Sequence, residues 1–173
     1  VTRALYFPNV TAPAARLRER LDAVRAAGCR GVLVSPWLVG LDTLRLIRDD
    51  YGFAILAHPA LTGSLFGRSA GIAPELVLGD LFRLAGADAV IYPNTGGRFD
   101  FSAATCERLN HHLRRPLGGL RATMPVPAGG MNVNSAARWA RRYGPDTVLL
   151  IGGSLYAQGD LAAGAAALRE SVE

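Results

Sequence analysis

Short apolar runs alternate with longer amphipathic stretches along the whole chain. The apolar runs predict strands at residues 3–8, 32–36, 53–58, 89–93, 124–128 and 147–151. Apolar residues at three- and four-residue spacing predict helices at residues 13–28, 40–52, 73–86, 102–115, 134–144 and 159–172. Four of these helices close on a glycine, as helix C-termini prefer: Gly28, Gly52, Gly86 and Gly144.

About six β-α units in strict alternation predict a parallel sheet with helices packed outside it. Such a fold is either an open doubly wound sheet or a (β/α)₈ barrel. A doubly wound sheet that binds nucleotides usually has G-x-G-x-x-G after its first strand, whereas residues 8–16, PNVTAPAAR, contain no glycine. Instead, a glycine pair follows each of the last two predicted strands, where a barrel often holds phosphate. The pairs are Gly129-Gly130 and Gly152-Gly153.

A complete barrel takes eight units and about 250 residues, and this chain has 173 residues. We therefore predict an α/β fold that is a partial TIM (β/α)₈ barrel. It would be a single domain over residues 1–173, whose six or so units correspond to strands 3–8. The first two β-α units would be missing.

The basic residues are all arginine. The formal net charge is +5 with no lysine in the sequence, and the arginines are spread along predicted helices rather than gathered in a block. This pattern indicates solvated helix faces and no nucleic-acid partner. Without lysine, the chain cannot supply a Schiff-base lysine, a catalytic lysine or a lysine carbamate as metal ligand.

The same composition bears on compartment. No uninterrupted apolar stretch approaches the roughly 18 residues of a membrane span, so no membrane partner is predicted. Cys29 and Cys106 lie far apart without metal-ligand spacing, which favours buried free thiols and a cytoplasmic location.

A glycine pair at a strand end has two interpretations. It can simply turn the chain, or it can bring backbone N–H groups close to an anion because no side chain stands in the way. His58, at the end of the run AILAH, is either a structural hydrogen-bonding residue or a proton shuttle.

Several segments together resemble the C-terminal barrel of the RuBisCO large-chain superfamily, and most closely its RuBisCO-like proteins. The resemblance covers essentially the whole chain and rests on the segments VLVSPWLVGLDTLR, ILAHPALTGSLFG, GIAPELVLGDLFRLAGADAVIYPNTGGRF, PVPAGGM and DTVLLIGGSLYAQGDL. It implies a Mg²⁺-assisted reaction that removes a proton next to a carbonyl of a phosphorylated sugar-like substrate. The family's metal ligands and a catalytic lysine lie on the first two strands, so the resemblance implies no metal ligand in this chain.

The resemblance also assigns site residues. The family's phosphate-holding backbone groups match Gly130, Gly152 and Gly153, and Gly129 allows the close approach. His58 matches a histidine at the mouth of the family's active site. Asn94 is a possible substrate contact or a turn-forming residue.

Three positions depart from the carbon-fixing pattern. Pro59 stands where carboxylases have an arginine that binds a second phosphate. Their second phosphate-site histidine would fall near Ile91, and their loop lysine that polarises CO₂ would fall near Arg98. Arg98 could still bind a carboxylate or phosphate. These departures favour isomerisation, enolisation or decarboxylation of a phosphorylated sugar or sugar acid over CO₂ fixation.

Three hypotheses remain open from the sequence. The chain is part of a RuBisCO-like enzyme that acts as a homo-oligomer or with a complementing N-terminal segment. Alternatively, it is a phosphate-binding module without chemistry. The third possibility is an incomplete, inactive fragment whose unpaired edge strands leave it poorly folded on its own.

Overall fold

The structure is a computed structural model that describes residues 4–67, 69–99 and 101–172. It contains a parallel sheet in the order β1-β2-β3-β4, with strands β1 (Gly31–Val34), β2 (Ala54–Ala57), β3 (Ala89–Pro93) and β4 (Met124–Ala128). Each strand therefore pairs with the next one in the chain. An open doubly wound sheet reverses its strand order at a switch point, so the sequential order confirms the partial barrel.

A further segment extends the sheet at each edge without forming a regular strand. At one edge Asn9 bridges Leu33 in parallel, and Val10 N–H donates to the Leu33 carbonyl at 2.9 Å. The prediction of a strand at residues 3–8 was therefore wrong in place: residues 4–8 are irregular, and pairing occurs at residues 8–10. Residues 1–3 of the chain, and with them the start of that prediction, lie outside the described residues.

At the other edge, the predicted strand at residues 147–151 is reduced to a bridge between Leu150 and Ala128. Val148 and Leu150 donate to the carbonyls of Pro125 and Pro127 at 3.0 and 3.2 Å. Both of these β4 residues are prolines, so neither can return an N–H bond to the edge segment. The loss of these donors explains why this pairing does not become a regular ladder.

The predicted helices are present. They and the shorter helical segments are α1 (Ala14–Ala26), α2 (Pro36–Val39), α3 (Leu41–Leu46), η1 (Ile47–Tyr51), η2 (Thr62–Leu65), η3 (Glu75–Leu81), α4 (Phe82–Ala85), α5 (Ala103–Arg114), α6 (Val133–Tyr143), α7 (Gly153–Tyr156) and α8 (Leu161–Val172). The four predicted terminal glycines all have positive φ, between +67° and +108°, as expected for helix ends. None of the described helices is both long and apolar enough to cross a membrane.

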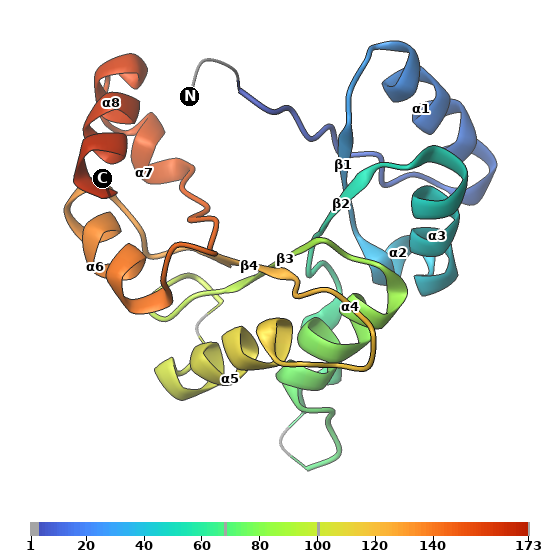
Figure 1. The fold of residues 1–173 in the computed structure, drawn as a ribbon. Helices are drawn as coiled ribbons and strands as arrows, with labels where there is room; N and C mark the ends of the chain where they lie inside the picture. The colour runs from blue at the N-terminus through green and yellow to red at the C-terminus, as the bar shows by residue number, and fades with distance from the viewer. Residues whose placement is uncertain (1–3, 68, 100, 173) are drawn as a thin grey trace.

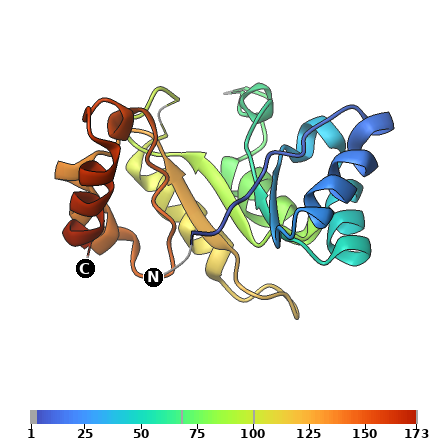
Figure 2. The ribbon, with the colours of Figure 1, turned by 90° about the horizontal axis from the view of Figure 1, so that it is seen from above.

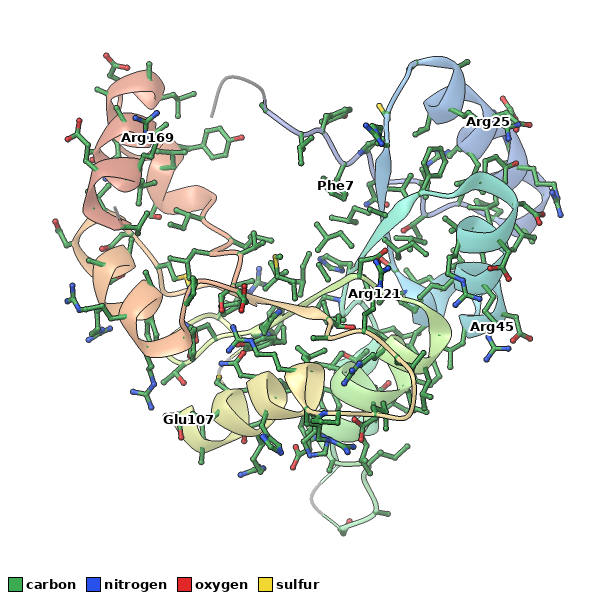
Figure 3. The ribbon with its side chains drawn as sticks, in the orientation of Figure 1. Phe7, Arg25, Arg45, Glu107, Arg121 and Arg169 are labelled. Atoms are coloured by element: carbon green, nitrogen blue, oxygen red, sulfur yellow. The ribbon has the colours of Figure 1, made fainter. Side chains whose placement is uncertain are left out.

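The elements form an open arc with the sheet inside and the helices outside (Figure 1). Helices α1–α3 lie at one end, α4 and α5 in the middle, and α6 and α8 at the other end. The N-terminal segment and α7 face each other across the opening, and Figure 2 shows the same arc from above. Arg25, Arg45 and Glu107 are exposed on the outer side of the arc (Figure 3), as the scattered charge pattern predicts.

The main core lies between the sheet and the helices. Alternate strand residues such as Val32, Ile55 and Val90 are buried in one cluster with helix residues such as Leu44 and Leu109. The intervening strand residues point to the other face, where Ile91 and Val126 are paired in register and buried outside that cluster. The sheet is thus apolar on both faces, as parallel sheets are.

One buried arginine fastens α4 to the end of α5. Arg83 is only 3% exposed. Its guanidinium donates to four backbone carbonyls at 2.6–3.2 Å, those of His112, Arg115, Leu120 and Arg121. Hydrogen bonds from a charged donor are among the stronger ones, so this side chain acts as a cross-brace between two outer elements.

Candidate functional site

The loops that follow β2, β3 and β4 surround one cavity at the carboxyl edge of the sheet. The cavity has a volume of about 720 Å³, and its lining includes three predicted site residues: His58, Arg98 and Gly129. Because the strands are parallel and sequential, their carboxyl ends lie at the same edge. The fold thus brings together residues that are far apart in sequence, at the edge where barrel enzymes carry their active sites.

His58 lies half-buried at the end of β2. Its Nδ1 accepts the N–H of Ala60 at 3.1 Å, so Nδ1 carries no proton and the neutral ring carries its proton on Nε2. Burial lowers the pKa of His58 below its ordinary value. The ring is therefore held neutral, as a hydrogen-bond donor through Nε2, in the wall of the cavity.

Arg98 is exposed in the loop after β3, and its guanidinium lies 5.3 Å from the ring centroid of Phe99. It supplies positive charge to the cavity lining. An exposed guanidinium at the rim can bind a carboxylate or phosphate group of a ligand.

Asn94 is fully buried and does not line this cavity. Its Oδ1 accepts the Tyr143 hydroxyl at 2.6 Å, while its Nδ2 has no partner among the described residues. Its backbone N–H donates to the Ala128 carbonyl at 2.9 Å. Asn94 therefore joins β3 to β4 and α6, and a direct substrate contact stays a prediction.

The fold itself requires the first glycine pair. Gly129 and Gly130 have φ of +93° and +67°. A Cβ on Gly130 would lie 3.0 Å from the carbonyl carbon and oxygen of Gly96, and one on Gly129 would lie 3.3 Å from the Gly97 Cα. The loops after β3 and β4 touch backbone to backbone, so packing accounts for both glycines whether or not they bind a ligand.

The fold makes no comparable demand on the second pair. A Cβ on Gly152 or Gly153 would meet no described atom within 4 Å, and neither residue has a positive φ. The N–H groups of Gly130, Gly152 and Gly153 donate to no other described residue. Open space beside unused donors is what an approaching anion needs.

A hydrogen bond holds the two glycine loops together. The Ser154 hydroxyl donates to the Met131 carbonyl at 2.6 Å. This bond and the Leu150–Ala128 bridge place both pairs at the same edge of the sheet. Sequence reasoning gave no role to Ser154, and nothing local in GGSLY indicates the contact.

Sequence reasoning also missed the aromatic residues of the cavity. Phe66 and Phe101, from the loops after β2 and β3, meet edge to face with centroids 5.6 Å apart, and both line the cavity. Their only sequence signal is that SLF and RFDF each follow a predicted strand within about ten residues.

The resemblance places the family's magnesium ligands on the first two barrel strands, and the described residues of this chain form no such site themselves. Among the described residues, no group of three or more His, Cys, Asp or Glu side chains could hold a metal ion. The sequence has no lysine to form a carbamate ligand. We therefore derive no step through a metal from these residues.

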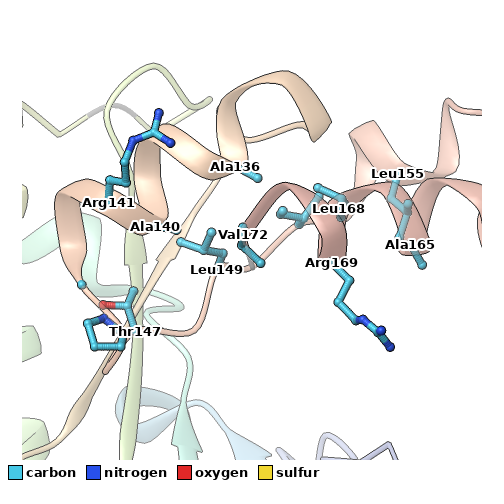
Figure 4. A pocket seen from close by; sticks show the side chains of 13 residues that line it. Ala136, Ala140, Arg141, Thr147, Leu149, Leu155, Ala165, Leu168, Arg169 and Val172 are labelled. Carbon is cyan, nitrogen blue, oxygen red and sulfur yellow. The ribbon is translucent and has the colours of Figure 1, made fainter. Parts of the chain in front are cut away.

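A second cavity, of about 740 Å³, lies between α6, residues 144–151 and α8 (Figure 4). Its lining is mostly apolar, with Ala136, Leu149 and Leu168 among its residues, and it contains no predicted site residue. We therefore assign the candidate site to the first cavity.

Known proteins resemble this chain in sequence and in fold. No family model matches the chain. The chain is 43% identical over 157 residues to ribulose bisphosphate carboxylase-like protein 1 of Rhodopseudomonas palustris, and the match covers 90% of this chain and 41% of that protein. It is 41% identical over 151 residues to the 5-methylthioribulose-1-phosphate isomerase of Rhodospirillum rubrum, covering 87% of this chain and 39% of that protein. The 2,3-diketo-5-methylthiopentyl-1-phosphate enolase of Geobacillus kaustophilus is 31% identical over 165 residues, and the match covers 94% of this chain and 40% of that protein.

Solved structures agree. A RuBisCO-like protein from Alicyclobacillus acidocaldarius superimposes with a TM-score of 0.89 at 35% identity, over 98% of this chain and 44% of that one. The octameric RuBisCO of Pyrococcus horikoshii superimposes with a TM-score of 0.88 at 26% identity, over 97% of this chain and 42% of that one. The chain thus spans about two fifths of the length of these proteins. In sequence and in fold it is a homologue of the C-terminal barrel region of the RuBisCO-like proteins.

Proposed function

We propose that this chain supplies the phosphate-binding and histidine-bearing part of an enolisation site. The parent enzyme would act as an isomerase, enolase or decarboxylase on a phosphorylated sugar or sugar acid. The observation that carries the proposal is the convergence of His58, Arg98 and Gly129 on one cavity, beside the unused N–H groups of the glycine loops. The names of the relatives support it, because they include an isomerase and an enolase of 5-methylthio pentose-like phosphates.

In this proposal the substrate phosphate lies against Gly130, Gly152 and Gly153. A charge-assisted bond from a backbone N–H to a phosphate oxygen contributes about 1.5–3 kcal/mol. Three such bonds anchor the substrate without a charged side chain. Gly129 contributes by keeping the first loop flat against its neighbour.

His58 donates a hydrogen bond to the carbonyl oxygen next to the reacting carbon. Removal of a proton beside a carbonyl places negative charge on the carbonyl oxygen, and the Nε2–H of a neutral imidazole can donate to that oxygen. The Ala60 N–H bond to Nδ1 fixes the ring in the tautomer that this role needs. Arg98 lies at the rim, where it can pair with a second acidic group of the substrate.

Carbon fixation is not proposed. Pro59 and Ile91, which stand where the resemblance places second-phosphate residues, are both in the cavity lining and offer no charge. The family uses lysine as a base and, as a carbamate, as a metal ligand. In this proposal the lysines come from polypeptide outside these 173 residues, such as a complementing N-terminal segment, which a partner subunit of a homo-oligomer could also carry.

The test is proton exchange on a reconstituted enzyme. The chain is co-expressed with the N-terminal half of the Rhodopseudomonas palustris relative, and 5-methylthioribulose 1-phosphate is followed by NMR in D₂O with Mg²⁺. We expect deuterium uptake beside the carbonyl, slowed about 10²-fold or more in His58→Asn. A complex that binds the substrate without any exchange would refute enolisation.

A phosphate-binding module without chemistry is the second candidate. The observation that favours it is that the described residues contain no potential metal cluster and the sequence contains no lysine. Titration of the isolated chain with inorganic phosphate by calorimetry tests the cradle that both candidates share. Gly152→Asp should abolish the heat by charge repulsion, whereas Gly152→Asn, which has the same shape without the charge, should retain most of it. Equal binding by the aspartate and asparagine variants would place the anion elsewhere.

A further inference from the structure

The two glycine loops of the proposed phosphate site are held to the fold in different ways. The first loop, residues 129–132, follows β4, which is paired along its whole length with β3. Its Met131 side chain is buried in the main core. The second loop, residues 152–154, follows an edge segment that joins β4 through the Leu150–Ala128 bridge and two N–H bonds to proline carbonyls. The sheet therefore fixes the first loop more firmly than the second.

Ser154 joins the second loop to the first. Its hydroxyl donates to the Met131 carbonyl at 2.6 Å. Among the described residues, no other hydrogen bond connects the first loop to residues 152–158. The acceptor has a fixed position, because Met131 is part of the core and the next residue, Asn132, caps α6 through a capping box. Ser154 thus attaches the second loop to a rigid point of the fold.

The other contact of this segment lies on the side away from the first loop. The second loop runs into α7, in which no residue is buried and which has no side-chain cap. Leu155 packs on α8, where a Cβ on the buried Gly164 would lie 2.9 Å from the Leu155 Cδ1. An apolar contact is not directional, whereas a short hydrogen bond fixes the distance between the groups that it joins. The packing of α7 on α8 therefore leaves the spacing of the two loops to Ser154.

We infer that Ser154 is a positioning residue, which sets the spacing of the two glycine loops so that the unused N–H groups of both loops meet on one phosphate. The inference rests on the proposed function, because it concerns the same anion site. Without the Ser154 bond each loop keeps its own N–H groups, but a phosphate accepts from one loop at a time. The Ser154 hydroxyl proton is committed to the Met131 carbonyl, so Ser154 acts through the glycines and does not itself donate to the phosphate.

The test is titration of the chain with inorganic phosphate, followed by calorimetry and by the amide NMR signals of the glycines. In the wild type, the signals of Gly130, Gly152 and Gly153 should shift together with one dissociation constant. Ser154→Ala should bind phosphate about tenfold or more weakly, the equivalent of at least one lost bond to a charged group. Its Gly130 signal should no longer follow those of the second loop. Ser154→Thr, which keeps the hydroxyl, should restore the wild-type affinity.

Control variants separate positioning from stability. Ser171→Ala removes another partly buried hydroxyl, which donates to the Leu168 carbonyl within α8 at 2.8 Å, and it should leave the affinity for phosphate unchanged. Leu155→Ala removes the contact with α8, so it should lower the melting temperature more than Ser154→Ala does and weaken phosphate binding less. Ser154→Cys has a weaker donor of similar size; it should bind phosphate with intermediate affinity, and it takes the place of Ser154→Ala if alanine prevents folding.

Three results would overturn the inference and leave the phosphate site in place. These are wild-type affinity in Ser154→Ala (or in Ser154→Cys where alanine prevents folding), an equal loss of affinity in Leu155→Ala, and a Ser154→Thr variant that binds no better than Ser154→Ala. If phosphate moved none of the three glycine signals in the wild type, the proposed function would fail, and the inference with it.

Discussion

Substitution of Gly130 by alanine tests the claim that two loops of the site touch backbone to backbone. The new methyl carbon would lie 3.0 Å from the carbonyl carbon and oxygen of Gly96 and 3.1 Å from the Thr95 oxygen. None of these is the end of a flexible side chain, so the loop after β3 or the loop after β4 must shift. The residue would also keep a φ of +67°.

Two costs add in this variant. A left-handed backbone costs an alanine about 1–2 kcal/mol, and forcing an extra methyl group into close packing costs about 1–3 kcal/mol. The free energy of unfolding should therefore fall by about 2–5 kcal/mol, which is a large part of the stability of a small domain.

Two other glycines serve as control positions that separate the cost of the left-handed backbone from the cost of the close packing. Gly28 has a φ of +75°, and no described atom lies within 4 Å of the place that an alanine methyl carbon would take, so Gly28→Ala should show only the backbone cost. Gly153 has neither constraint, and Gly153→Ala should stay within about 1 kcal/mol of wild type. The variants are compared by urea denaturation followed by circular dichroism, with a common slope. A Gly130→Ala loss no greater than that of Gly28→Ala would refute the close contact.

Two further predictions concern His58 and Arg83. Burial lowers the pKa of His58 in the folded chain, so below about pH 6.5 the unfolded chain binds the proton more readily and stability falls. Urea denaturation at pH 7.5 and 5.5 should show a smaller decline for His58→Gln, and an unchanged decline would contradict the shift. Arg83→Met leaves four carbonyls without their donor and should cost about 3–5 kcal/mol. Arg16→Ala, which removes an exposed ion pair with Glu19, should cost less than about 1 kcal/mol, and similar losses in both variants would argue against the cross-brace.

The helices and most strands could be predicted from the sequence, because a helix or a strand repeats its apolar positions at a fixed local period. α5 and α8 follow the three- and four-residue spacing, and the glycines after α4 and α6 mark where each helix ends. The sequential order of β1 to β4 could also be predicted, because the glycine pairs after the last two predicted strands favoured a barrel over a doubly wound sheet. The edge at residues 147–151 could have been assigned better, since the alternate prolines of MPVPA remove the N–H donors on one side of β4.

The site itself depended on contacts between residues that are distant in sequence, and no local period encodes these. The sequence alone supplied two similar glycine pairs, but only the tertiary structure separated them. Gly129 and Gly130 are needed because the loop after β3 lies against them, whereas Gly152 and Gly153 border open space. The positive φ of Leu61 and the meeting of Phe66 with Phe101 likewise arise only when the parallel strands bring their carboxyl ends together. The sequence therefore determined which residues reach that edge, and the curvature of the sheet determined which of them share a cavity.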